Sequence, residues 1–219
     1  MNRLKPLERT IRILLLCGVL AGPLFLLTIV MQIFTRTGYD FGHQPISFLS
    51  LGDGGWVQIV DFLVGGLLAI GFAAAVRRIL HTGPGRRWVP LLIAGFGAGL
   101  VIAGLFPPDP AFGFPPGTPE GMPQVMTYRS VLHGVGFTLC FASLIAACFV
   151  MAFRDGKDKK RGHLWYSVAT ALAALALSQW PGMEGASLRY LLAAVVAWTW
   201  ISVLSLRLMA IKSGTGALA

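Results

Sequence analysis

Polar side chains that could do chemistry gather in one short segment ahead of the second apolar run. His43, Ser47, Ser50 and Asp53 all fall within it. Ser47, Ser50 and Asp53 recur every three residues, so a helical turn would place them on one face. Such imidazole, hydroxyl and carboxylate groups could bind a polar headgroup. They could equally form interfacial hydrogen bonds and cap the helix that follows.

A second group of titratable residues lies inside or beside apolar runs, where charge is costly. Asp61 lies near the start of one run, and Arg129 and His133 are spaced i and i+4 at the start of another. A carboxylate at membrane depth costs roughly 2.5–3.5 kcal/mol on insertion scales, so we expect Asp61 to pair with Arg129 or His133. The pair could be a structural network, or a site for a headgroup, a proton or a metal.

Catalytic signatures such as HExxH, GxSxG and a phosphate-binding loop are missing from the chain. His133 beside Asp61 or Asp53 could still act as an acid–base. A metal site would need several side chains to converge across loops: His43, His133 and one of Asp40, Asp53 or Asp61. We therefore expect no metal and no cofactor, and a non-catalytic role is favoured over an enzyme.

Composition identifies the setting of these groups as a membrane. Of the 219 residues, 55% are hydrophobic and 12% are charged, with a mean hydropathy of +0.71. Soluble domains carry about 25% charged residues, so a soluble enzyme, a disordered tail and a nucleic-acid-binding module are excluded. We expect one all-α domain over 1–219, a six-transmembrane-helix bundle. Its apolar runs each approach the roughly 20 residues of a span: 11–34, 57–76, 88–106, 131–153, 163–180 and 188–210.

Basic residues predict the orientation of the bundle. All but three of the 18 Lys and Arg residues lie near the chain ends or in two short connections. The exceptions are Arg36, Arg129 and Arg189. The positive-inside rule therefore places the N- and C-termini and both basic connections in the cytoplasm, with the protein in the plasma membrane. The net charge of +9 then reports topology and not nucleic-acid binding.

Two long connections, 35–56 and 107–127, would then be extracytoplasmic. The second is too rich in proline and glycine for a helix. Its phenylalanines, Phe106, Phe112 and Phe114, favour a packed cap over the bundle, with a mobile lid as the alternative. Within the first connection, Pro45 to Leu51 predicts a short amphipathic segment lying at the interface under this cap.

Small residues predict where helices approach closely. Gly95, Gly99 and Ala103 form one small-xxx-small series, and Gly65 and Ala69 form another. A partner membrane subunit or a second copy could cover such seams. Trp198, in the middle of the last run, could line an internal cavity or face lipid.

Three short motifs stand out in the chain: the pattern from His43 through Ile46-Ser47 and Leu49-Ser50 to Gly52, the pairs Asp61-Phe62 and Gly65-Gly66, and Leu132-His133-Gly134. Together they resemble a bacterial and archaeal family of six-helix membrane proteins, classed as a domain of unknown function. That family is distantly similar to the Frag/DRAM/Sfk group, which is tied to lipid remodelling. The resemblance implies a six-helix bundle and a link to lipids, and it supplies no reaction.

We expect the protein to bind a lipid or other amphiphile at an extracytoplasmic pocket, as an accessory, sensor or assembly factor. The alternatives are an enzyme acting on a lipid headgroup through His133 and Asp61, and a proton-coupled transporter using Asp61. Expected partners are membrane lipids and a partner subunit or second copy, but not nucleic acid. The expected ligand-binding residues are His43, Ser47, Ser50, Asp53, Asp61, Arg129 and His133.

Overall fold

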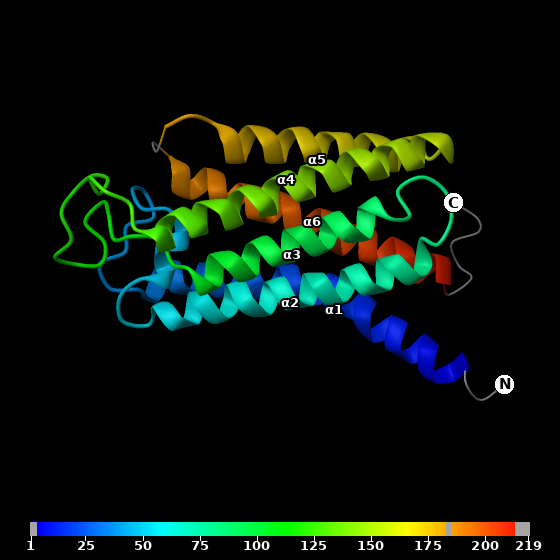
Figure 1. Cartoon of the computed structure of the whole chain (residues 1–219), viewed down its shortest axis with the longest axis horizontal. Coiled ribbons are helices and arrows are strands. Elements are labelled where there is room, and N and C mark those ends of the chain that lie inside the picture. The colour runs from blue at the N-terminus through cyan, green and yellow to red at the C-terminus, as the bar shows by residue number, and fades with distance from the viewer. Residues whose placement is uncertain (1–3, 183–184, 213–219) are drawn as a thin grey trace.

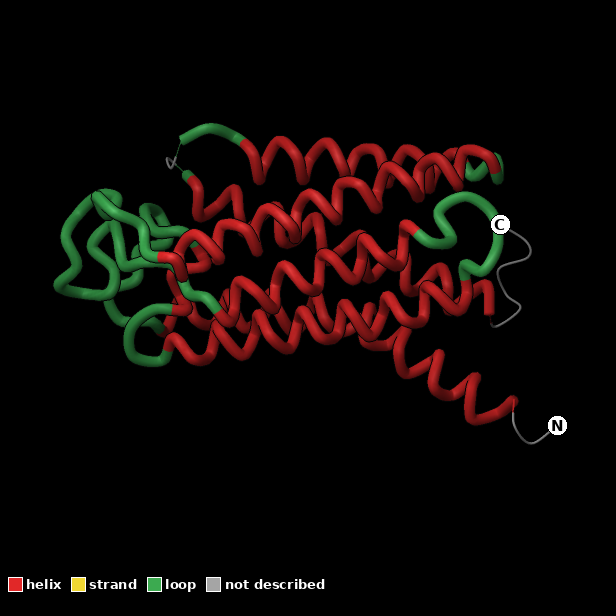
Figure 2. The backbone as a smooth tube through the Cα atoms, in the orientation of Figure 1, coloured by secondary structure: helices red, strands yellow, loops and turns green. Residues whose placement is uncertain are grey.

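The computed structural model describes residues 4–182 and 185–212, and within these ranges the protein is all-α with no strand. Six long helices lie lengthwise beside one another, with the long loops gathered at one end (Figures 1 and 2). The elements are α1 (Leu4–Thr35), the short 3-10 helix η1 (Ile46–Ser50), α2 (Gly55–Ile79), α3 (Trp88–Leu105), α4 (Tyr128–Lys157), α5 (Arg161–Gln179) and α6 (Ala186–Lys212). We call the end with loops 36–54 and 106–127 the loop end, and the opposite end the basic end.

Five of these helices are long and apolar enough to cross a membrane: α1 from Glu8, α2, α3, α4 and α6. The predicted all-α, multi-pass membrane protein is therefore confirmed. A helix, α5, also covers the sixth predicted span. Its first turns carry Arg161, His163 and Tyr166, so it lacks the apolar length of the other five. Its crossing of the membrane stays a prediction.

The helices form a closed ring because each packs on its neighbours in sequence and α6 returns to α1. Gly22 permits the closure, since a Cβ there would lie 2.7 Å from the Cβ of Trp198. Pro23 has no N–H, so the carbonyl of Val19 lacks its usual helical donor. The hydroxyl of Ser202 on α6 donates to that carbonyl at 3.3 Å.

Glycines also set the spacing of α2, α3 and α4. A Cβ on Gly99 would lie 2.6 Å from the carbonyl oxygen of Gly136, which confirms the predicted close packing along the Gly95 series. The α2–α3 crossing lies at Gly66 and Gly97, where a Cβ on either would meet the other's carbonyl oxygen. Gly65 instead faces the side chains of Phe25 and Trp198.

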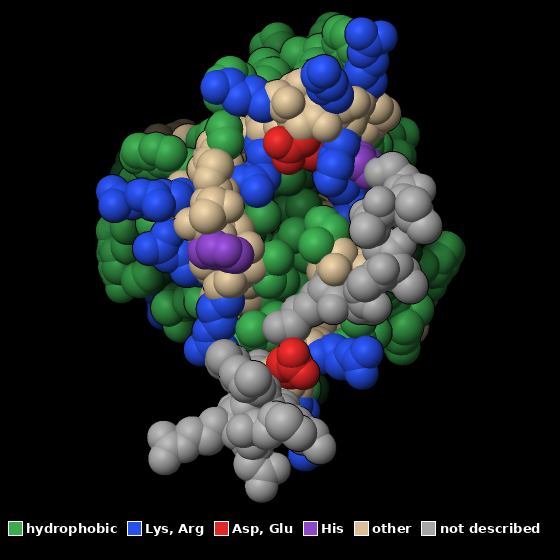
Figure 3. All heavy atoms as spheres, turned by 90° about the vertical axis from the view of Figure 1, so that its right-hand side faces the viewer, with side chains coloured by type: hydrophobic (Ala, Val, Ile, Leu, Met, Phe, Trp, Pro, Cys, Tyr) green, Lys and Arg blue, Asp and Glu red, His purple; other side chains and the backbone are tan. Residues whose placement is uncertain are grey.

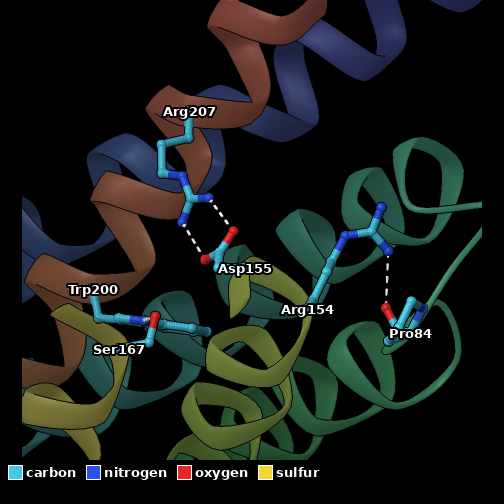
Figure 4. A network of polar contacts seen from close by, with 6 residues as sticks. All are labelled: Pro84, Arg154, Asp155, Ser167, Trp200 and Arg207. Carbon is cyan, nitrogen blue, oxygen red and sulfur yellow. Dashed lines mark hydrogen bonds and ion pairs between the residues drawn. The ribbon is translucent and has the colours of Figure 1, made fainter. Parts of the chain in front are cut away.

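At the basic end, Lys and Arg side chains gather around the rim (Figure 3). Polar contacts also tie the helices together there (Figure 4). Arg207 of α6 donates two hydrogen bonds, of 3.1 and 2.7 Å, to the buried carboxylate of Asp155 on α4. The indole of Trp200 donates to Ser167 of α5 at 3.1 Å, and Arg154 donates to the carbonyl of Pro84 at 2.8 Å.

Candidate functional site

The two long loops pack on each other at the loop end, and the side chain of Gln44 joins them. Its amide nitrogen donates to the carbonyl of Phe112 at 2.9 Å, and its amide oxygen accepts from the backbone N–H of Asp40. The backbone carbonyl of Gln44 accepts from the hydroxyls of Tyr39 and Ser187, which connects the loops to α6. Gln44 is buried, and the sequence analysis did not single it out.

Aromatic side chains fill the space between the two loops. The ring of Tyr39 meets Phe114 edge-on at 5.6 Å between centroids, and Phe48 lies 6.1 Å from Phe112. Burial, reinforced by the nearby charge of Asp40, raises the pKa of the Tyr39 hydroxyl above its ordinary value, so this group stays protonated and donates to Gln44.

Beneath the loops lies a cavity of about 300 Å³ inside the ring of helices. It is lined by both loops, η1, and α1, α2, α3, α4 and α6. Along α6 the lining runs from Tyr190 to Trp198, about 12 Å at 1.5 Å per residue. Most of the lining is apolar. The aromatic side chains that line it from the helices include Phe25, Phe62, Phe96, Phe137, Phe141 and Trp198.

His133 of α4 reaches the cavity wall with its tautomer fixed by α3. Its Nδ1 lies 3.1 Å from the carbonyl oxygen of Ala103 and 3.0 Å from that of Phe106. The carbonyl of Ala103, in the last turn of α3, would accept from residue 107 if the helix continued, but that residue is Pro107, which has no N–H. The carbonyl of Phe106 lies just past the end of the helix. The imidazole supplies the missing donor. Nδ1 therefore carries a proton, and Nε2 is the ring nitrogen left for a ligand.

Ser130 lies one turn before His133 on the same face of α4 and also lines the cavity. Its oxygen accepts from the backbone N–H of Asp109 at 3.2 Å, so its own hydroxyl proton remains available. The carboxylate of Asp109 accepts from the backbone and hydroxyl of Thr127 at 2.7 and 2.6 Å. These bonds fix the second loop to the beginning of α4.

Ser47 and His133 are the two predicted binding residues that the structure brings to this cavity. Ser50 is buried and its hydroxyl donates to the backbone carbonyl of Ser47 at 2.7 Å. His43 is exposed, 3.6 Å from the carboxylate of Glu120. Asp53 is exposed and lies beyond η1, because Leu51 is extended and ends the turn.

The short segment predicted over Pro45 to Leu51 forms the 3-10 helix η1. Ile46, Phe48 and Leu49 are buried inside the protein, so η1 packs beneath the loops. The reason is that the second loop supplies an aromatic partner, Phe112, on its other side.

The predicted pairing of Asp61 with Arg129 or His133 is wrong. Asp61 is 8% exposed and accepts a long hydrogen bond of 3.5 Å from Gln58 on its own helix. Gln58 in turn accepts from Gln32 of α1 at 2.8 Å. Arg129 is exposed and forms no ion pair with the described residues. Asp61 is thus joined through Gln58 to α1, and not to α4.

Arg36 joins the first loop to the second. Its guanidinium donates to the carbonyl of Leu51 and lies 5.9 Å from the ring centroid of Phe114. Burial lowers its pKa, and the charge of Asp53 opposes this change. Arg36 and Gln44 thus both join the two loops, and no spacing in the sequence identifies them.

The structure does not bring together His133 and a carboxylate as an acid–base pair, nor the His43 and His133 set considered as a metal site. The ring of His133 contacts backbone carbonyls and the ring of Phe62, and no carboxylate of residues 4–182 or 185–212. Among the described residues, no three His, Cys, Asp or Glu side chains lie close enough to hold a metal ion.

Sequence reasoning missed Ser130, Asp109 and Tyr190 as lining residues. Ser130, His133, Phe137 and Cys140 recur at the period of a helix and form one face of α4. That period was visible in the sequence, but nothing in it showed that this face surrounds an empty space.

In comparison with known proteins, the chain matches one family model. The family model described as "Protein of unknown function (DUF998)" matches residues 19–207. The predicted resemblance to a membrane family of unknown function is thereby confirmed, while the similarity to the Frag/DRAM/Sfk group stays a prediction. No curated protein and no solved structure is similar enough to match the chain.

Proposed function

The chain belongs to the DUF998 family of proteins of unknown function, and we propose that it is a multi-pass membrane protein that binds an amphiphile in the cavity at its loop end. The observation that carries the proposal is the cavity itself. Ligand pockets measure roughly 300–1,000 Å³ and combine an apolar lining with a few placed polar groups. This cavity, of about 300 Å³, has that composition.

The placement of polar groups indicates how an amphiphile would lie. Ser47 belongs to the first loop, and Ser130 and His133 lie in the first two turns of α4. Trp198, Phe96 and Phe141 line the deeper part, toward the middle of their helices. A hydrocarbon tail would occupy the deep aromatic part, and the head would meet the hydroxyls and imidazole beside the loops.

We further propose that the loop end is extracytoplasmic, that the loops cap the bundle, and that α5 is the sixth crossing. The basic rim at the other end supports this orientation, because cytoplasmic connections carry the excess of Lys and Arg. The contacts of Gln44 and Phe112 support a packed cap. The protein would act in the plasma membrane as a non-catalytic accessory, sensor or assembly factor.

The test is native mass spectrometry of the full chain released from nanodiscs of its own membrane. Gly134 lines the cavity and a Cβ there would meet nothing within 4 Å, so Gly134→Leu adds an apolar side chain at the cavity wall with room for its Cβ. Gly162→Leu is the matched control, since Gly162 is equally unobstructed but lies on α5 at the basic end. Asp61→Asn controls for loss of a carboxylate away from the lining.

We expect wild type, Gly162→Leu and Asp61→Asn to retain one defined lipid mass, and Gly134→Leu to lose it. His133→Asn should retain it about tenfold less strongly, the loss of roughly one hydrogen bond to Nε2. If Gly134→Leu retained the same mass as wild type, or wild type retained none, the cavity would not be a binding site.

A further inference from the structure

The charges around the cavity bear on which amphiphile it accepts. We infer that the cavity selects an uncharged lipid with a single chain or ring system and a hydroxyl or carbonyl head, and that it rejects anionic phospholipids. This inference rests on the proposed function and specifies its ligand.

The lining offers no positive charge to an anionic head. Among the described lining residues there is no Lys or Arg, and the one carboxylate is that of Asp109. A phosphate placed beside Ser130 would therefore be desolvated without a countercharge, close to an acidic group. Burial of an unpaired charge is strongly unfavourable, so a phosphate head is disfavoured at this position.

The arginines at the loop end do not line the cavity. Arg36 donates to Leu51 and lies over Phe114. Arg189 donates to the carbonyls of Trp180 at 2.9 Å and Gly182 at 2.6 Å. Arg129 is exposed at the beginning of α4 and does not line the cavity. Thus none of these three arginine side chains belongs to the cavity lining.

The polar groups that do line the cavity suit a neutral head. The hydroxyls of Ser47, Ser130 and Tyr190 can each donate one hydrogen bond, and Nε2 of His133 can accept one from a ligand hydroxyl. Ester carbonyls, glycerol hydroxyls and quinone carbonyls all match this set. An acylglycerol and an isoprenoid quinone therefore share the required chemistry.

The volume limits the ligand to one chain. A cavity of about 150 Å³ holds a single benzene ring, and this one measures about 300 Å³. It is also elongated along α4 and α6, since the lining on α4 runs from Ser130 to Phe141. One extended acyl segment or one ring with a short tail fits, whereas two acyl chains would not.

The experiment compares three probes of similar length on the purified full chain in a bulky steroid detergent. The probes are monolauroylglycerol, decylubiquinone and lauroyl lysophosphatidic acid, each at the same free concentration. Native mass spectrometry counts the retained adduct in wild type, Gly134→Leu and Gly162→Leu. The samples are prepared at pH 8, above the ordinary histidine pKa of about 6.5, so that an imidazolium does not attract the anion.

We expect wild type and Gly162→Leu to retain at least one neutral probe about tenfold or more above lysophosphatidic acid, and Gly134→Leu to lose it. Whichever neutral probe is retained distinguishes an acylglycerol from a quinone. If wild type retained lysophosphatidic acid as well as the neutral probes, and Gly134→Leu lost it, charge selection would be overturned while amphiphile binding stood. If wild type retained no probe, or Gly134→Leu retained as much as wild type, amphiphile binding itself would fail.

Discussion

His133 and Asp155 lie on the same helix near opposite ends of the bundle, and each is held by a polar partner far away in sequence. His133 donates to two backbone carbonyls at the end of α3, and Asp155 accepts from Arg207. Asp155 and Ala103 are buried, so loss of the partner leaves a buried polar group without its hydrogen bond. The energetic cost of removing either partner should therefore be large for a single side chain.

Replacement of His133 tests the first contact. We expect His133→Leu to lower the free energy of unfolding by about 1–3 kcal/mol, because the two carbonyls lose their donor. His133→Asn should lose less, since its amide can donate near the position of Nδ1. Thermal unfolding in one detergent measures the difference. A wild-type melting temperature for His133→Leu would show that the carbonyls find other donors.

Replacement of Arg207 tests the second contact. Asp155 is 2% exposed, so Arg207→Leu leaves a buried carboxylate unpaired and should cost about 3–5 kcal/mol. The double variant Arg207→Leu, Asp155→Leu should recover most of this loss, because no charge remains buried. A double-mutant cycle on thermal unfolding gives the result, and additive losses would argue against the ion pair.

At the scale of elements, α4 uses glycine for two different purposes. Gly136 lets α3 approach, and a Cβ there would lie 2.7 Å from the carbonyl oxygen of Gly99. Gly134 faces open space at the cavity mouth. Glycine thus permits close packing against α3 at position 136 and leaves unfilled space beside the helix at position 134.

This difference predicts opposite effects of one small substitution. Gly99→Ala would place its Cβ 2.6 Å from the backbone of α4, and we expect a loss of about 1–3 kcal/mol from overpacking. Gly134→Ala should be neutral or stabilising by up to about 1 kcal/mol, because alanine favours the helix and meets no obstacle. Unfolding temperatures of the two variants measure this contrast, and equal losses would contradict it.

At the scale of the whole molecule, the basic end and the loop end differ in charge and in exposed groups, so the proposed orientation can be tested. Val125 is 82% exposed in the second loop, and Asp158 is exposed between α4 and α5. In a variant without Cys17, Cys140 and Cys148, we expect Val125→Cys to react with an impermeant maleimide on intact cells. Asp158→Cys should react only after permeabilisation, and the reverse pattern would invert the proposed topology.

The features of the fold that the sequence predicted are those that depend on residues close together in the chain. Five apolar runs became helices able to cross a membrane, and the weaker run at 163–180 became α5. The Gly95 series predicted a close helix contact correctly, whereas the α1–α6 closure at Gly22 was not anticipated. Hydropathy and glycine spacing are properties of one segment and can be read from its residues. The pairing of helices depends on segments far apart in the chain and cannot be read in this way.

The sequence by itself determined the membrane class, the helices and two residues of the candidate site, Ser47 and His133. The tertiary structure alone decided that Asp61 faces Gln58 and α1, that Arg129 stays exposed, and that a cavity exists. The physical reason is that partition into a membrane depends on sums over contiguous residues. A cavity and its charge depend on which faces of distant helices meet, and on where their side chains fail to fill the space between them.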